Sequence, residues 1–247
     1  MKTFDLASTV QRLLTPQEIL APFVFDENGI MHEDVRQGLL KIADFVINKT
    51  IKNISGLRVT DVCLTGSCSG YLYHNNSDID IRIVVKNEHC SALAKDKKHF
   101  DMFLAAQLNG FLIQTKELRY QKRVVDVKMS SENIDFLSLY SIKNNQWLIK
   151  PEKDLKLTED EIMEYYLKRK QEISEEFERI KQKYHGRELG KQINEFYIRT
   201  YERSIVGKPM VKDYFVFKLL HYERLLKPIG AESIRAYNEA FTLKSHP

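Results

Sequence analysis

The sequence predicts an α+β fold, in which a sheet-forming region is followed by a C-terminal bundle of helices. Apolar residues alternate with period two in three segments between residues 57 and 129, which is typical of β-strands. From residue 158 onward they recur at three-, four- and seven-residue steps, which is typical of amphipathic helices. We therefore expect one domain at residues 1–150, with helices at its N-terminal end, and a helical bundle at residues 151–247.

Residues 1–57 are predicted to form helices that are separated by one turn. Thr15-Pro16-Gln17-Glu18 has the form of a capping box with proline at the first helical position, so we expect a helix to begin there. Asp26-Glu27-Asn28-Gly29 has turn composition. A second, amphipathic helix is expected from His32, where the apolar positions follow helical spacing at Val35, Leu39, Ile42 and Val46.

The middle of the chain changes to strand periodicity. A small-residue turn at residues 65–70 separates the first two expected strands. A helix is expected between the second and third strands, and a turn through Asn144-Asn145 leads into a last short strand. The expected strands are residues 57–64, 79–85, 118–129 and a short one within 140–149, and the expected helix is residues 100–111.

Helical signals fill the remainder of the chain beyond a hinge at residues 151–157. Thr158-Glu159-Asp160-Glu161 is a capping box, and Gly186 is placed to end the helix that it opens. Further helices are expected at about 188–206, from Pro209 to Pro228, and at about 231–243. Short connections between them favour a bundle of neighbouring helices.

Composition excludes several classes of protein. No apolar run approaches the roughly 18 residues that a membrane span needs, so we expect no membrane partner. The net charge is +4, and basic and acidic residues are divided equally between residues 1–150 and 151–247, which marks no nucleic-acid face. Three cysteines, Cys63, Cys68 and Cys90, are too few for a disulfide framework, and a reducing cytoplasm is the expected location.

Three aspartates carry the chemistry that we predict. Asp78 and Asp80 lie two residues apart in an apolar strand, so their side chains share one face. Like charges at this distance repel, and a divalent cation removes the conflict; carboxylate oxygens suit Mg²⁺. Asp126 lies in a neighbouring predicted strand between apolar residues. Three carboxylates on adjacent strands can hold two metal ions, which together stabilise the attacking and leaving oxygens of a phosphoryl displacement.

The turn at Gly66-Ser67 supplies an anion site. Ten residues separate Ser67 from Asp78. Glycine lets a ligand approach the backbone closely, and exposed N–H groups with a serine hydroxyl can bind phosphate oxygens. Taken singly, each aspartate has a simpler interpretation as a solvated strand residue or an ion-pair partner, and Gly66-Ser67 as an ordinary turn. Their order and spacing together favour a nucleoside-triphosphate site.

Three residues near the predicted site each allow a functional and a structural interpretation. Cys68 follows Ser67 but has no visible histidine–acid partner, so we interpret it as a small buried residue and not as a nucleophile. Arg82 shares the face of Asp80, and Lys128 shares the face of Asp126. Either could contact a phosphate, although an ion pair with a nearby carboxylate is the preferred interpretation.

The pattern Leu64-Thr65-Gly66-Ser67, followed by Ser77-Asp78-Ile79-Asp80-Ile81, resembles the signature of the DNA polymerase β-like nucleotidyltransferase superfamily. Weaker similarity, at Val35-Arg36, at Leu139-Tyr140-Ser141-Ile142 and at Trp147-Leu148, resembles predicted nucleotidyltransferases of tailed bacteriophages. The phage-type pattern often has glutamate where this chain has Asp126. The resemblance implies a small mixed β-sheet with flanking helices. It also implies Asp78, Asp80 and Asp126 as ligands of two Mg²⁺ ions, with Mn²⁺ as a substitute, and Gly66 and Ser67 at the triphosphate.

The predicted reaction moves a nucleoside monophosphate from an NTP, with ATP expected, to a hydroxyl acceptor and releases pyrophosphate. Asp126 would help to deprotonate the acceptor. An RNA 3′ end is one acceptor class. The alternatives are adenylylation of a small molecule or a protein, and a non-catalytic module that only senses nucleotide. Retention of all three acids argues against the last alternative.

Overall fold

The structure, a computed structural model, describes residues 4–88, 97–115, 117–132, 137–202 and 211–241. The chain divides into two compact units, Pro16–Asp154 and a second formed by Met1–Thr15 with Leu155–Pro247. The expected domains, 1–150 and 151–247, put the N-terminal helix with the sheet. In the structure that helix, α1 (Leu6–Leu14), contacts α5 (Glu159–Lys183) and α7 (Val211–Tyr222) of the second unit.

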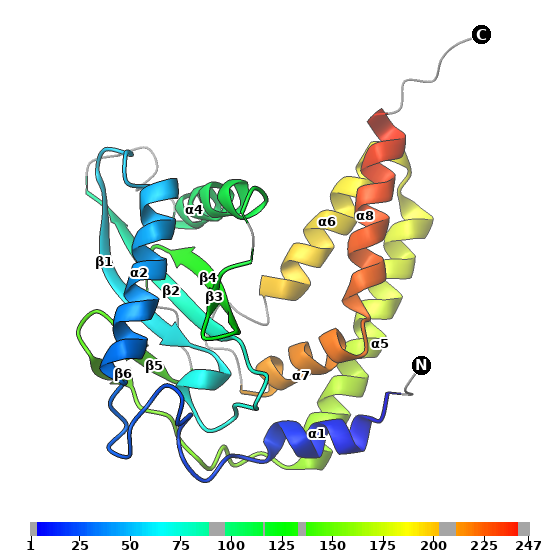
Figure 1. Cartoon of the computed structure of the whole chain (residues 1–247). Helices are drawn as coiled ribbons and strands as arrows, with labels where there is room; N and C mark the ends of the chain where they lie inside the picture. The colour runs from blue at the N-terminus through cyan, green and yellow to red at the C-terminus, as the bar shows by residue number, and fades with distance from the viewer. Residues whose placement is uncertain (1–3, 89–96, 116, 133–136, 203–210, 242–247) are drawn as a thin grey trace. The chain divides into compact units, whose positions relative to one another are not determined.

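The unit Pro16–Asp154 contains a mixed six-stranded sheet, which confirms the α+β prediction (Figure 1). The strand order is β3-β4-β2-β1-β5-β6. β2 and β4 are parallel, and the other neighbouring strands are antiparallel. The strands are β1 (Leu57–Thr65), β2 (Ile79–Asn87), β3 (Arg119–Tyr120), β4 (Arg123–Ser130), β5 (Leu139–Ser141) and β6 (Gln146–Ile149).

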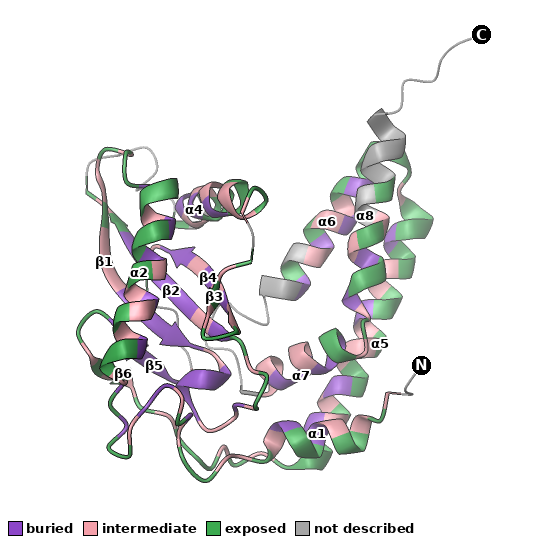
Figure 2. Ribbon diagram, viewed as in Figure 1, coloured by how far each residue is buried: buried purple, intermediate pink, exposed green. Residues whose placement is uncertain are grey.

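Two helices, α2 (Glu33–Thr50) and α4 (Lys97–Leu112), cover one face of this sheet. The α2 side chains Val35, Leu39 and Val46 are buried as predicted, while the outer side of α2 is exposed (Figure 2). The remaining buried position is Ala43, and Ile42, which was expected there, is only partly buried. Each fully buried valine or leucine contributes about 1.5–3 kcal/mol of transfer free energy. The sheet contributes the odd-numbered residues of β2 and β4 to this core, so their even-numbered residues point to the opposite face.

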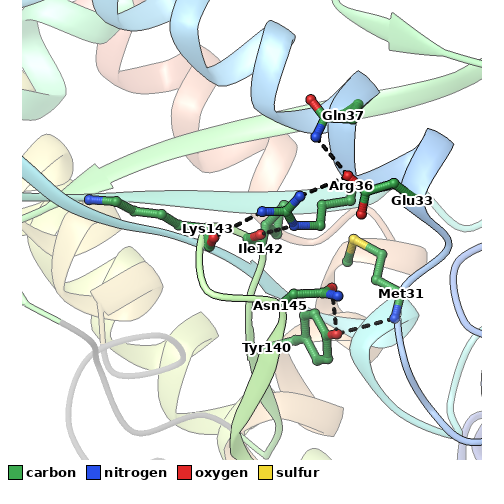
Figure 3. Close-up of polar contacts among 8 residues, drawn as sticks. All are labelled: Met31, Glu33, Arg36, Gln37, Tyr140, Ile142, Lys143 and Asn145. Carbon is green, nitrogen blue, oxygen red and sulfur yellow. Dashed lines mark hydrogen bonds and ion pairs between the residues drawn. The ribbon is translucent and has the colours of Figure 1, made fainter.

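Polar contacts connect α2 to the β5–β6 hairpin (Figure 3). Arg36 Nε donates to the Ile142 carbonyl at 2.9 Å, and Arg36 Nη2 donates to the Lys143 carbonyl at 3.1 Å. The buried Tyr140 hydroxyl accepts from Met31 N at 3.1 Å and donates to Asn145 Oδ1 at 2.9 Å. Two segments more than 100 residues apart in the sequence, Val35-Arg36 and Leu139-Tyr140-Ser141-Ile142, are therefore joined by hydrogen bonds (Figure 3).

The predicted helix at Thr15-Pro16 is wrong. Thr15 ends α1 instead, since its hydroxyl donates to the Gln11 carbonyl at 2.8 Å, and Asp5 caps the start of that helix. Beyond Pro16 the chain is extended or turned, and Gln17 N donates to the Tyr71 carbonyl at 2.7 Å, where a helix would need its own partners. The turn at residues 26–29 is confirmed, because Asp26 Oδ1 accepts from Asn28 N and Ile30 N.

The second unit is helical. It contains α1, α5, α6 (Gly186–Glu202), α7 and α8 (Leu226–Phe241), and α6 packs along α8. The capping box at Thr158 is confirmed: its hydroxyl accepts from Glu161 N, and the Glu161 carboxylate accepts from Thr158 N. No helix in the described part of the chain is long and apolar enough to cross a membrane.

Several boundaries in this unit differ from the prediction. Gly186 is the first residue of α6, since α5 already ends at Lys183, and the last helix begins at Leu226 and not near Ala231. Pro228 was expected to end the third helix, but α7 already ends at Tyr222, and Pro228 is the third residue of α8. The first turn of a helix tolerates proline because the N–H groups there have no intrahelical partner. Cys90, the predicted helix end near 206, the start near Pro209 and the end near 243 lie outside the described residues.

Candidate active site

The parallel pairing of β2 and β4 places two of the predicted acids side by side. Asp80 on β2 is the direct register partner of Asp126 on β4, and Thr65, the last residue of β1, is the partner of Asp80 on its other side. Both aspartates have even numbers, so they lie on the face opposite α2 and α4. Period-two alternation predicted the shared face of the residues along each strand, while the parallel pairing and the register of Asp80 with Asp126 come from the structure.

Gly66 lies against the Asp80 carboxylate. Its backbone has φ 72° and ψ −159°, a conformation that is essentially restricted to glycine. A Cβ atom built at Gly66 would lie 2.1 Å from Asp80 Oδ2 and 2.8 Å from Asp80 Cγ. Glycine is therefore required at this bend for two reasons. Residues with a side chain rarely adopt this backbone conformation, and a Cβ atom here would collide with the Asp80 carboxylate.

The bend is bonded to the loop that leads into β2. Ser67 and Cys68, in the short 3₁₀ helix η1 (Ser67–Ser69), are buried. Ser67 Oγ donates to Ser77 Oγ at 3.2 Å, and Cys68 Sγ donates to the carbonyl oxygen of Asp78 at 3.0 Å. Ser77 Oγ also accepts from His74 N at 2.9 Å. These bonds hold the backbone on both sides of Asp78 in one position.

Arg123, at the start of β4, holds the same loop from the other side. Its Nη1 donates to the carbonyl oxygens of Asn75 at 2.8 Å and of Ser77 at 3.0 Å. The guanidinium lies over the Phe23 ring, 3.5 Å from its centroid. Sequence reasoning missed this residue, because no motif marks an arginine whose partners are backbone carbonyls.

Lys128 lies two residues beyond Asp126 on the same face of β4. Its Nζ is 3.1 Å from Asp126 Oδ2 and 3.9 Å from Asp80 Oδ1. The preferred interpretation of Lys128, an ion pair with a carboxylate of the site, is confirmed. Arg82 on β2 is buried and pairs in register with Lys128 on β4. These two cationic residues therefore lie two positions along the strands from Asp80 and Asp126.

Asp78 is placed differently from the other two acids. It precedes the first residue of β2, and its side chain is exposed. Among the described residues, no group of three His, Cys, Asp or Glu side chains is arranged to hold a metal ion. The structure thus brings Asp80 and Asp126 together but does not add Asp78 to them, and the three-ligand set stays a prediction. The oxygen donors of the adjacent pair fit a hard cation such as Mg²⁺.

The environment of Cys68 is that of an inert thiol. Burial, reinforced by the negative charge of Asp80, raises the pKa of Cys68 to about 12. A thiolate is the reactive form of cysteine, and it is scarce at neutral pH when the pKa is this high. The interpretation of Cys68 as a small buried residue is therefore confirmed.

Comparison with known proteins identifies the family. The sequence pattern of the nucleotidyltransferase domain matches residues 46–184, more than half of the 247 residues, and this span contains Gly66, Ser67 and all three predicted aspartates. Comparisons with curated proteins and with solved structures find no match. The match supports the predicted place in the DNA polymerase β-like superfamily. Together with the paired acids beside a glycine bend, it shows that the chain belongs to the nucleotidyltransferase domain family.

Proposed function

We propose that this protein transfers a nucleoside monophosphate from an NTP to a hydroxyl acceptor and releases pyrophosphate, in a metal-dependent reaction. The observation that carries the proposal is the register pairing of Asp80 with Asp126 on parallel strands, with the Gly66 bend against Asp80. Two carboxylates directly opposite each other on neighbouring strands repel, which costs stability unless positive charge offsets it. A binding role for a divalent cation explains why both are present.

Asp78, Asp80 and Asp126 would hold two Mg²⁺ ions, for which Mn²⁺ can substitute. When bound, such ions stabilise charge on the attacking and leaving oxygens. The backbone of Gly66 and the hydroxyl of Ser67 would contact the triphosphate. That hydroxyl donates to Ser77 in the structure, so it would exchange this bond for one to a phosphate oxygen.

The proposed reaction is a single displacement at the α-phosphorus of the NTP. The acceptor oxygen forms a bond to the α-phosphorus of the NTP. The bond from that phosphorus to the oxygen that bridges the α- and β-phosphates breaks, and this oxygen leaves with pyrophosphate. The proton of the acceptor hydroxyl passes to the Asp126 carboxylate, whose side chain is 42% exposed and thus reachable by an acceptor. Fixed orientation of the loop before Asp78 lowers the entropy cost of reaching this geometry.

We further propose ATP as the nucleotide, a cytoplasmic location and kinship with the tailed-phage enzymes. The hydrogen bond from Arg36 to the Ile142 carbonyl supports that kinship, because it joins two of the segments that carry the similarity. For the acceptor, an RNA 3′ end, a small molecule and a protein are the classes to be separated by experiment.

The test is incubation with NTPs labelled at the α-phosphate, Mg²⁺ and total cellular RNA, protein and metabolites. Label in one of the three fractions identifies the acceptor class. The double variant Asp78→Ala with Asp80→Ala should lose transfer while remaining folded by circular dichroism. Asp44→Ala, which removes an exposed acid from α2, is the matched control and should keep full activity. Full activity in the double variant, or no transfer and no metal-dependent NTP binding by the unaltered protein, would refute the proposal.

A further inference from the structure

The Asp80–Asp126 pair needs a positive charge even when no metal is bound. Neighbouring strands lie about 4.7–4.9 Å apart, and like charges directly opposite each other destabilise a sheet. Asp80 is 22% exposed and Asp126 is 42% exposed, so water screens their repulsion only in part. A group of the protein itself must offset the remaining repulsion in the metal-free state.

Lys128 is placed to do this. Its ammonium lies within ion-pair distance of both carboxylates, 3.1 Å from Asp126 and 3.9 Å from Asp80. The position follows from strand geometry, since residues two apart on β4 share a face and the long lysine side chain spans the step back to Asp126. One cation between two anions occupies the space in which a divalent ion bridging the same oxygens would have to lie.

We propose that Lys128 is a built-in counter-ion of the metal-free site and that a divalent cation binds by displacing its ammonium from the two carboxylates. An ammonium and a metal ion repel each other, so both cannot stay between the same oxygens. The side chain of Lys128 is 37% exposed and flexible, so the ammonium can move toward solvent or toward the phosphates of a bound nucleotide. This inference rests on the proposed function, because it assumes that Asp80 and Asp126 bind a divalent cation.

The test uses the full-length protein without nucleotide and has two readouts, neither of which is catalysis. The first is the Kd for Mn²⁺, measured from the electron paramagnetic resonance signal of free Mn²⁺. The second is the melting temperature in EDTA and in Mn²⁺. The variants are Lys128→Met, which removes the charge, and Lys128→Arg, which keeps it. Lys86→Met is the control, since Lys86 is exposed on β2 six residues beyond Asp80.

Lys128→Met should bind Mn²⁺ about two- to tenfold more tightly than the unaltered protein, in keeping with a partly exposed ion pair. In EDTA it should melt a few degrees lower, on the order of 2–4 °C, and Mn²⁺ should raise its melting temperature by more. Lys128→Arg should match the unaltered protein in EDTA and bind Mn²⁺ no more tightly, because its charge still competes. Lys86→Met should change neither readout.

Equal or weaker Mn²⁺ binding by Lys128→Met would overturn the inference while leaving the proposed function intact. Tighter binding by Lys128→Arg would also overturn it, and this variant keeps the test decisive if Lys128→Met does not fold. Failure of the unaltered protein to bind Mn²⁺ at all would instead overturn the proposed function, and this inference with it.

Discussion

Substitution of Gly66 by alanine perturbs the site at the point where backbone and carboxylate meet. The backbone conformation at Gly66, φ 72° and ψ −159°, costs a residue with a side chain about 1–3 kcal/mol. For a chain of this size, each 1 kcal/mol lowers the melting temperature by about 2–4 °C. We therefore expect Gly66→Ala to melt roughly 2–12 °C lower than the unaltered protein.

The added methyl group also displaces Asp80. It would lie 2.1 Å from Asp80 Oδ2, far inside van der Waals contact, so the carboxylate must move by about 1 Å. A displacement of this size in a catalytic group can cost about 10²-fold in rate. Gly66→Ala should accordingly reduce nucleotidyl transfer on the order of 100-fold, measured at a temperature at which the variant is folded.

Gly110→Ala is the matched control for this experiment. A Cβ atom at Gly110, within α4, would meet no atom within 4 Å, and alanine is preferred over glycine inside helices. Its stability should rise by about 0.5–1 kcal/mol with transfer unchanged. A Gly66→Ala variant that keeps both the melting temperature and the transfer rate of the unaltered protein would contradict this prediction.

Three further predictions concern residues around and beyond the site. Arg123→Met should lower transfer about tenfold, because the loop before Asp78 loses two charged hydrogen bonds of about 1.5–3 kcal/mol each; an unchanged rate in a steady-state assay would contradict a positioning role. Cys68→Ser should retain transfer, and the native thiol should resist iodoacetamide at pH 8, since its pKa is raised to about 12; inactivation in either experiment would make Cys68 a participant. Burial and the hydrogen bond to Asp213 raise the pKa of Tyr165 from 10.0 to about 12, so its contribution to stability is complete below pH 10 and is lost as the pH rises toward 12. Urea unfolding between pH 10 and 12 should therefore show a steeper loss of stability for the unaltered protein than for Tyr165→Phe, and equal slopes would count against this assignment.

The faces on which Asp80 and Asp126 lie were predictable because period-two alternation determines which side chains share a face. The single strand expected at 118–129 is divided into β3 and β4 by a turn at Gln121 and Lys122. Ile79, Ile81 and Ile83 reach the core with α2 and α4, and this leaves Asp80 on the opposite face. The same rule put Asp126 and Lys128 on one side of their strand. The resemblance to a known superfamily added the family, which the family match supports, and the roles of the site residues, which stay predictions.

The errors arose where local patterns have more than one structural use. The side chain of Thr15 can form hydrogen bonds at either end of a helix. Its bond to the Gln11 carbonyl, which places Thr15 at the end of α1, is known only from the structure. Pro228 can follow a helix or stand in the first turn of the next. Arg123 binds backbone carbonyls of a loop that is 46–48 residues away in the sequence, so no local spacing reveals it.

The most direct test of the account is the position of Mn²⁺ in crystals grown with Mn²⁺ and a non-hydrolysable NTP, located by anomalous scattering. We expect density between Asp80 and Asp126, with Asp78 drawn toward it, the triphosphate at the Gly66 bend and the Lys128 ammonium moved off the carboxylates. Mn²⁺ and nucleotide bound elsewhere, with Lys128 still between Asp80 and Asp126, would contradict it.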